Sequence, residues 1–179
     1  MTIEVNPTQK QSQALKLLLD KKHTEVLFGG GAGGGKSYLG CLWIVSLCLQ
    51  YPGVRCLIGR AQLKTLKETT LNTLFDALKN LGLKKDTHYK YNGHSNLLIF
   101  SNKSEIMLKD LEAYPSDPNF DSLGGLEITA AFLDESNQIT EKAKMVVSSR
   151  IRYKLDEYGL IPKMLMTCNP AKGWVYDEF

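Results

Sequence analysis

The segment GGGAGGGKS at residues 29–37 has the residue types and the spacing needed to bind a polyphosphate. It contains the pattern G-x-x-x-x-G-K-S from Gly30 to Ser37, which is the spacing of a phosphate-binding P-loop, or Walker A motif. Because glycine has no Cβ, such a loop can turn successive backbone N–H groups toward one anion. In this motif we expect Lys36 to contact the β- and γ-phosphates and Ser37 to ligate Mg²⁺. The other residues expected to surround the nucleotide are Gly30, Gly31, Ala32, Gly33, Gly34, Gly35 and Tyr38.

The residues on either side of this loop favour a nucleotide site over a flexible glycine-rich linker, which is the alternative explanation. Thr24–Phe28 is a short β-prone run, and Ser37–Gln50 is apolar on nearly every side, as in a helix packed against a sheet. A helix that begins at Lys36 would direct the positive end of its dipole toward the phosphates. A strand, a glycine-rich loop and a helix form the context that a P-loop requires.

The segment Ala130–Glu135 has the pattern of a Walker B motif, in which an apolar strand ends in acidic residues. In an open parallel sheet, ligands bind beyond the carboxyl ends of the strands, so we expect Asp134 near the Mg²⁺ that Ser37 holds. Glu135 can then orient an attacking water and accept its proton. The acidic pair favours hydrolysis, because a small-molecule kinase must keep water away from the γ-phosphate. A strand that ends in two solvated acids is the alternative interpretation.

Three polar side chains are weaker candidates, because each also has an ordinary structural explanation. Thr167 and Asn169 follow a β-prone run and could sense the γ-phosphate or hold the attacking water, yet an Asn-Pro turn also ends many strands. Gln9 could bind the adenine edge through its amide, or it could be an exposed glutamine on a helix.

Arg60, Arg150 and Arg152 are the candidates for a catalytic arginine finger. Arg60 is expected at the end of a strand, on the ligand side of the sheet, whereas Arg150 and Arg152 follow the helix after the Walker B segment. Each of them could equally be a solvated arginine at the end of an element. The basic residues that could contact a phosphate backbone, or form an ordinary solvated face, are Lys84, Lys85, Lys142, Lys144, Arg150, Arg152 and Lys154.

The length and composition are those of one soluble globular domain with a substantial core. The chain has 179 residues, of which 43% are hydrophobic and 23% charged, and its net charge of +3 permits nucleic-acid binding without requiring it. No apolar run could span a bilayer and the N-terminus lacks a signal-peptide core, so we expect neither membrane insertion nor secretion. The four cysteines lack paired spacing, which argues against zinc and for buried, reduced thiols in the cytoplasm.

Alternating strand and helix patterns predict an α/β fold with a mostly parallel sheet flanked by helices. The predicted helices are 7–22, with Asn6 as N-cap, 36–50, 61–81, ended by Gly82, and 140–150. The strands predicted for the parallel sheet are 24–28, 54–58, 128–133 and 163–167. Short strands at 88–91, 96–100 and 105–109 predict a small antiparallel insertion before the Walker B segment, and residues 111–125 are expected to form a loop.

In this order, the segments resemble the ATPase domain of the large terminase subunit of tailed bacteriophages, the motor that packages DNA into procapsids. The Walker motifs are common to many ATPases, whereas the order and spacing of all the segments together are more specific. The segments that carry the resemblance are Pro7-x-Gln9, Leu57–Arg60, Leu97–Leu108, Glu127–Ala130, Ser149–Arg152, Met166–Pro170 and Trp174–Tyr176.

The resemblance implies a P-loop NTPase of the RecA-like (ASCE) class that uses ATP and Mg²⁺ to move double-stranded DNA into a viral procapsid. It also implies that Thr167 and Asn169 couple hydrolysis to DNA movement. The implied partners are double-stranded DNA, the portal protein, the small terminase subunit and other copies of the chain in a ring motor, with no membrane. The expected location is the host cytoplasm, with transient docking at the procapsid portal.

Two departures from the family limit what the resemblance implies. Some terminases carry a trans-acting arginine in the loop before Walker B, but residues 111–125 contain none. A whole large terminase also has a C-terminal nuclease domain, so we expect residues 1–179 to be the ATPase domain of a longer protein, without nuclease activity. The residues alone leave open a helicase- or recombinase-like ATPase, a nucleotide-binding scaffold that does not hydrolyse ATP and, more distantly, a small-molecule kinase.

Overall fold

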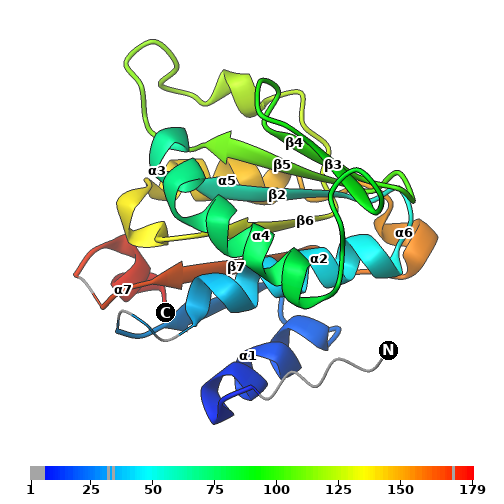
Figure 1. Cartoon of the computed structure of the whole chain (residues 1–179). Helices are drawn as coiled ribbons and strands as arrows, with labels where there is room; N and C mark the ends of the chain where they lie inside the picture. The colour runs from blue at the N-terminus through cyan, green and yellow to red at the C-terminus, as the bar shows by residue number, and fades with distance from the viewer. Residues whose placement is uncertain (1–6, 32, 34, 171) are drawn as a thin grey trace.

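The computed structural model describes residues 7–31, 33, 35–170 and 172–179, which form a seven-stranded sheet with helices on both faces (Figure 1). The strands are β1 (Glu25–Gly29), β2 (Arg55–Arg60), β3 (Tyr89–Asn92), β4 (Leu97–Phe100), β5 (Glu105–Asp110), β6 (Ala130–Leu133) and β7 (Lys163–Cys168). From one edge of the sheet to the other, their order is β1-β7-β6-β2-β5-β4-β3.

Neighbouring strands in the run β1-β7-β6-β2-β5 are parallel, which confirms the mostly parallel sheet. Their carboxyl ends therefore share one edge, on the left in Figure 1. The predicted antiparallel insertion is present as β3 and β4, but it is not a separate unit. β5 pairs in parallel with β2 along its whole length and in antiparallel fashion with β4, so the hairpin widens the main sheet.

The helices cover the sheet in two layers. One face carries α1 (Gln9–Leu19), α2 (Lys36–Gln50), α3 (Leu63–Glu68) and α4 (Thr70–Asn80), over a core that includes Ile44, Leu74 and Phe132. The other face carries η1 (Asp121–Leu123) and α5 (Glu141–Ser149), and Trp174 of α7 (Trp174–Glu178) packs against the same core. The remaining short helices are η2 (Ser136–Gln138) and α6 (Leu155–Tyr158). None of the helices in the described ranges is both long and apolar enough to cross a bilayer.

The first helix is shorter than the predicted 7–22, and its capping residue differs. Thr8 is the N-cap, and it forms a capping box with Gln11, in which each side chain accepts a hydrogen bond from the other's backbone N–H. The predicted cap, Asn6, lies outside the described residues. At the other end, Asp20 Oδ1 accepts hydrogen bonds from the backbone N–H groups of Lys22 and His23, so this segment turns away from the helix.

The single helix predicted over 61–81 is wrong, because the structure divides it at Thr69. This residue has φ −125° and ψ −75°, and it separates α3 from α4. Its hydroxyl donates to the carbonyl of Thr65 at 2.6 Å, a contact that bends helices because it competes with their backbone bonds. The predicted end of the segment is confirmed, since Gly82 has a φ of +72° and follows the last turn of α4.

Gly40, in α2, allows the backbone of this helix to pack closely against the Phe132 ring of the central strand β6. A Cβ atom at position 40 would lie 2.4 Å from Cζ of Phe132, whose ring is fully buried. The helix that follows the P-loop is therefore held at close range against the strand that carries the Walker B motif.

We predict that Gly40→Ala lowers the free energy of unfolding by about 1–3 kcal/mol, because the added methyl group must displace the Phe132 ring. Urea denaturation followed by circular dichroism measures this change. Gly125→Ala is the control, since a Cβ there meets no atom within 4 Å, and it is expected to leave the stability unchanged. Equal stability of the two variants would show that α2 and β6 are not in close contact.

Candidate nucleotide-binding site

The P-loop connects the carboxyl end of β1 to the first residue of α2, which begins at Lys36 as predicted. Gly33 and Gly35 have φ values of +80° and +65°, a region that residues with a Cβ rarely adopt. Ala32 and Gly34 lie outside the described residues. Gly35 is the N-cap of α2 and supplies no side-chain cap, so the first N–H groups of this helix are available to an anion.

Lys36 lies inside the loop, where its ammonium group is hydrogen-bonded on several sides. Nζ donates to the carbonyl oxygens of Gly30 and Gly31, both at 2.7 Å, and to Oδ1 of Asn169 at 3.2 Å. The side chain is buried. The charge that is expected to contact phosphate is thus already held in place by the loop carbonyls and Asn169.

Asp134 follows β6 directly, and its buried carboxylate is the meeting point of several elements. Ser37 Oγ donates to it and lies 3.0 Å from each carboxylate oxygen. Thr167 Oγ1 donates to Oδ1 and Thr70 Oγ1 to Oδ2, both at 2.6 Å. Arg60 Nη1 lies 3.7 Å from Oδ2 and forms an ion pair. The structure therefore brings the Walker A serine and the Walker B aspartate into direct contact.

At Glu135 the backbone leaves the extended conformation of β6, and the side chain lies in the same site as Asp134. Its φ of +53° places it in the left-handed region, which is unfavourable for a residue with a Cβ. Its backbone N–H donates to Thr167 Oγ1 at 3.3 Å, and its carboxylate accepts hydrogen bonds from Asn169 Nδ2 at 3.2 and 3.4 Å. Since Asn169 also accepts from Lys36, it connects the expected base with the expected phosphate-binding lysine.

Lys36, Ser37, Glu135 and Asn169 border a cavity of about 380 Å³. Its lining residues are Gly33, Gly35, Lys36, Ser37, Tyr38, Thr73, Glu135 and Asn169. It lies beyond the carboxyl ends of parallel strands, which is where ligands bind in open α/β sheets. The arrangement combines a cation, hydroxyl groups and a carboxylate, so it can bind a phosphate and orient a water beside it.

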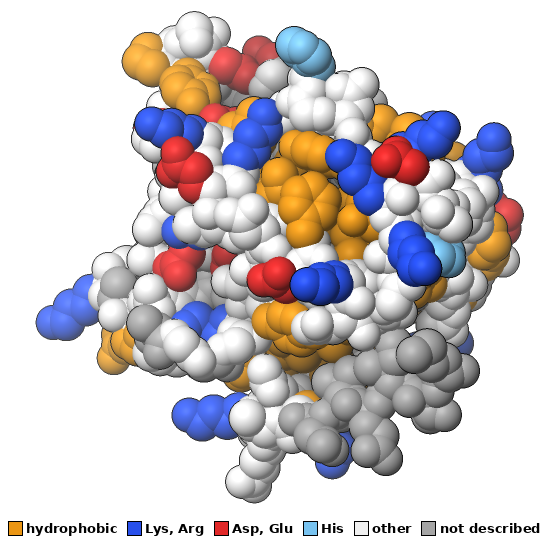
Figure 2. Space-filling model, in the orientation of Figure 1, with side chains coloured by type: hydrophobic (Ala, Val, Ile, Leu, Met, Phe, Trp, Pro, Cys, Tyr) orange, Lys and Arg blue, Asp and Glu red, His pale blue; other side chains and the backbone are white. Residues whose placement is uncertain are grey.

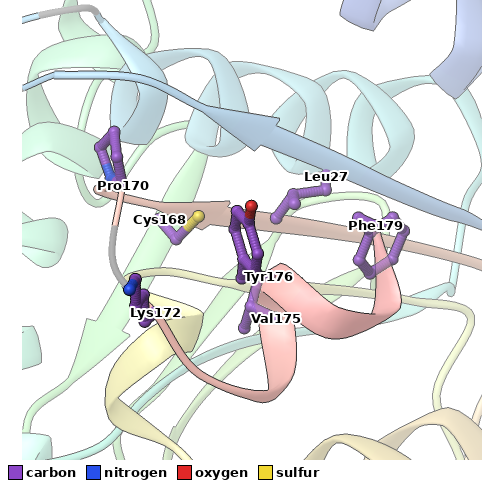
Figure 3. A pocket seen from close by; sticks show the side chains of 7 residues that line it. All are labelled: Leu27, Cys168, Pro170, Lys172, Val175, Tyr176 and Phe179. Atoms are coloured by element: carbon purple, nitrogen blue, oxygen red, sulfur yellow. The ribbon is translucent and has the colours of Figure 1, made fainter.

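A larger groove of about 670 Å³ lies beside α7, and its lining is mostly apolar (Figure 3). Side chains of α7 lie there beside Leu27 of β1 and Cys168 of β7. Lys172 is the charged residue among those that line it in the described part of the chain. In the described part of the chain, the lining of this groove includes no acidic side chain and no serine or threonine, so we assign the nucleotide to the P-loop cavity.

The weaker polar candidates, Thr167, Asn169 and Gln9, lie in three different environments. Thr167 is fully buried and its hydroxyl is engaged with Asp134, whereas Asn169 lines the cavity. Gln9, the first residue of α1, is exposed. Gln11 is the glutamine that reaches the P-loop, with Nε2 3.4 Å from the carbonyl oxygen of Gly35. The capping-box spacing of Thr8 and Gln11 could have indicated this second glutamine.

The arginine candidates lie at opposite ends of the sheet. Arg60 ends β2 beside Asp134, whereas the backbone of Arg152 bonds to that of Ile128, which precedes β6. Ile128 and Asp134 are separated by six residues of nearly extended chain, or about 20 Å. Arg152 also pairs with Glu127 at 3.4 Å. The structure thus does not bring Arg150 or Arg152 to this cavity within one chain.

Two members of the predicted basic run are already paired with acidic side chains. Lys144 is buried and pairs with Glu25 at 2.8 Å and with Glu178 at 2.6 Å. Burial alone would lower the pKa of Lys144, but its two carboxylate partners raise it overall, so this group stays charged. Lys154 pairs with Glu157 at 3.2 Å. On the face shown in Figure 2, lysine and arginine side chains are scattered among other types instead of forming one patch.

Sequence reasoning missed Thr69 and Thr70, which lie at the break between α3 and α4. Thr69 Oγ1 accepts a hydrogen bond from Arg60 Nη1 at 2.8 Å, while Thr70 contacts Asp134. Two adjacent β-branched hydroxyl residues within a predicted helix were the available signal, because such residues can redirect backbone hydrogen bonds.

The donor atoms at this site fit a magnesium ion. Ser37 and Asp134 offer oxygen ligands in direct contact with each other, as a hard cation requires. The described residues contain no cluster of three or more histidine, cysteine or acidic side chains that could hold a metal by themselves. A P-loop site does not need one, because phosphate and water oxygens complete the coordination. Burial and the charge of Glu135 raise the pKa of the Cys168 thiol, so this sulfur stays protonated and is a poor ligand.

Comparisons with known proteins place these observations in one family. The model of the family described as phage terminase large subunit matches residues 21–179. A search of curated protein sequences found no match.

Solved structures of large terminases share the fold. The large terminase from a thermophilic bacteriophage is 18% identical, with a TM-score of 0.77 over 98% of this chain and 42% of that one. The complex of that terminase with ATP-γ-S is 17% identical, with a TM-score of 0.72 over 96% of this chain and 40% of that one. The large terminase ATPase domain of Thermus phage P74-26 is 18% identical, with a TM-score of 0.61 over 98% of this chain and 75% of that one.

The chain thus spans about two fifths of the length of the first of these terminases. At these identities the structural likeness establishes the fold, an α/β P-loop ATPase domain, which agrees with the predicted class. The family match covers most of the chain and includes both Walker segments. This chain belongs to the phage terminase large subunit family, and its fold is that of the family's ATPase domain.

Proposed function

We propose that this domain hydrolyses ATP in a magnesium-dependent reaction that powers movement of double-stranded DNA into a viral procapsid. The observation that carries the proposal is the contact between Ser37 of the P-loop and the buried carboxylate of Asp134, with Glu135 beside it. Family membership supports the DNA-packaging role.

In this proposal the P-loop binds the phosphates. Lys36 contacts the β- and γ-phosphates, and the N–H groups at the start of α2 bind phosphate oxygens, because their positive dipole end faces the loop. The large terminase from the thermophilic bacteriophage has been solved with ADP and with ATP-γ-S, which supports an adenine nucleotide as the substrate here. Gln9 remains our candidate for adenine binding, while Gln11 contacts the carbonyl oxygen of Gly35 in the loop.

Ser37 and Asp134 would hold the magnesium ion, which when bound supplies charge that neutralises the β- and γ-phosphate oxygens. Glu135 accepts a proton from the attacking water, and its left-handed backbone turns its carboxylate toward the cavity. Asn169 holds that carboxylate and contacts Lys36, so a change at the γ-phosphate reaches both residues. Thr167 also responds to the γ-phosphate, through its hydrogen bond to Asp134.

Position separates the candidate arginine fingers into one that can act within the chain and two that can act only between copies. Arg60 lies close to Asp134 and can act within the chain. Arg150 and Arg152 lie at the other end of β6, so they can act on ATP only in a neighbouring copy, as in a ring motor. The proposed partners are double-stranded DNA, the portal protein, the small terminase subunit and further copies of the chain, in the host cytoplasm at the procapsid portal.

Phosphate release with and without duplex DNA tests this function, together with displacement of a triplex-forming strand from that duplex. Magnesium-dependent release that duplex DNA stimulates, with strand displacement, supports the motor. Nucleotide binding without phosphate release would instead indicate an assembly scaffold. Separation of the duplex strands would indicate a helicase.

We predict that Glu135→Gln binds ATP but loses steady-state hydrolysis by a factor of about 10²–10⁴, because the amide cannot accept the proton of the water. Phosphate release and binding of a fluorescent ATP analogue measure the two properties separately. Glu157→Gln is the control, since Glu157 is exposed and pairs with Lys154 away from the cavity. Normal turnover in Glu135→Gln would remove Glu135 from the mechanism.

We also predict that Lys36→Ala abolishes ATP binding, because it removes the cation that the loop holds at its mouth. Fluorescence titration with the same analogue measures the affinity. Lys79→Ala, at an exposed position of α4, is expected to bind like the unmodified chain. If Lys36→Ala keeps full affinity, the P-loop assignment is wrong.

A further inference from the structure

Thr70 lies outside both Walker motifs, yet it donates a hydrogen bond to the Walker B carboxylate. Its Oγ1 lies 2.6 Å from Asp134 Oδ2, and each of the two residues is only 1% exposed. A hydroxyl bound to a carboxylate at this distance makes a strong, charge-assisted bond. We propose that Thr70 is a positioning residue for magnesium binding, which holds the Asp134 carboxylate in the orientation that faces Ser37. This inference rests on the proposed function.

The break between α3 and α4 explains how Thr70 reaches this position. Because Thr69 leaves helical geometry, the chain restarts and Thr70 becomes the first residue of α4. Its backbone is held there, since Cys41 Sγ of α2 donates to its carbonyl at 3.7 Å. The interruption therefore brings a hydroxyl group to Asp134 from the side of α2 and α4.

The two oxygens of Asp134 have different principal donors. Thr167 binds Oδ1 and Thr70 binds Oδ2, while Ser37 lies at 3.0 Å from both. The torsion that rotates an aspartate carboxylate is soft, so one donor does not fix its plane. With a donor on each oxygen, the carboxylate is held on both sides and keeps its face toward Ser37.

Thr69 and Thr70, which are adjacent at the break, bind groups of opposite charge. Thr69 binds the Arg60 guanidinium, and Thr70 binds the Asp134 carboxylate. Thr69 accepts from Arg60 Nη1 at 2.8 Å, and Arg60 Nη1 lies 3.7 Å from Asp134 Oδ2. Removing the Thr70 hydroxyl takes away one hydrogen bond and leaves both charges in place. A substitution at Thr70 therefore tests the orientation of Asp134 without changing the net charge around the ion.

The test is Thr70→Val, which replaces the hydroxyl with a methyl group of similar size. We expect the Mg²⁺ concentration for half-maximal binding of mant-ATP, a fluorescent ATP, to rise roughly 10- to 100-fold, as for partners that orient metal ligands. Phosphate release should show the same shift in Mg²⁺ requirement. Binding of mant-ATP in EDTA should not change, because Thr70 does not line the nucleotide cavity. Thr70→Ser, which keeps the hydroxyl, should restore the normal Mg²⁺ requirement.

Thr129→Val is the matched control. Thr129 is also buried, and it precedes β6 at the end opposite Asp134, where its hydroxyl donates to the carbonyl of Tyr153 at 3.0 Å. This variant should lose stability and keep its Mg²⁺ requirement. A second control is Thr70→Val in an Asp134→Asn background, where the shift should disappear, because Thr70 acts through that carboxylate. If Thr70→Val does not fold, Thr70→Ala takes its place in both comparisons.

An unchanged Mg²⁺ requirement in Thr70→Val, with hydrolysis intact, overturns the role of Thr70 and leaves the proposed function standing. The same shift in Thr129→Val would also overturn it, because the effect would then reflect general loss of stability. If the unmodified chain shows no magnesium-dependent binding of mant-ATP, the proposed function and this inference are both wrong.

Discussion

A carboxylate that is 1% exposed is stable only when its oxygens accept hydrogen bonds or its charge is paired. Asp134 meets this requirement with hydroxyl groups from three elements and with the guanidinium of Arg60. Each donor lies at the carboxyl end of a parallel strand or at the start of a helix on the same edge of the sheet. The parallel arrangement of β1, β7, β6 and β2 is therefore what allows the site to form.

The P-loop lysine adds a second constraint, because it is already bonded to its own loop and to Asn169. A phosphate that binds Lys36 competes with the carbonyls of Gly30 and Gly31 for the same ammonium protons. Any release of Asn169 also changes the hydrogen bonds on Glu135. Phosphate binding and the position of the proposed base are in this way linked by one side chain.

Much of this arrangement could be predicted from the sequence, because the P-loop and the Walker B strand have short, local signatures. The start of α2 at Lys36 followed from the P-loop spacing, and the left-handed Gly82 followed from a glycine at the end of an amphipathic run. The break at Thr69 has only a weak local signal, the two adjacent threonines, because the apolar pattern continues across it. Arg60 and Asp134, which bind Thr69 and Thr70, are distant in sequence. Strand β5 and its antiparallel pairing with β4 were predicted, but its parallel pairing with β2 was not, because that pairing depends on tertiary contacts. Short helices such as α6 and α7 were missed because four or five residues carry too little periodicity to detect.

The contact between Gly40 and Phe132 has a mechanical consequence for a proposed motor. Because the Phe132 ring of β6 fills the space directly against the backbone of α2 at Gly40, sliding of the helix along the strand would cause a steric clash. If the domain works as the proposed motor, this contact favours movement of α2 and β6 together as one unit.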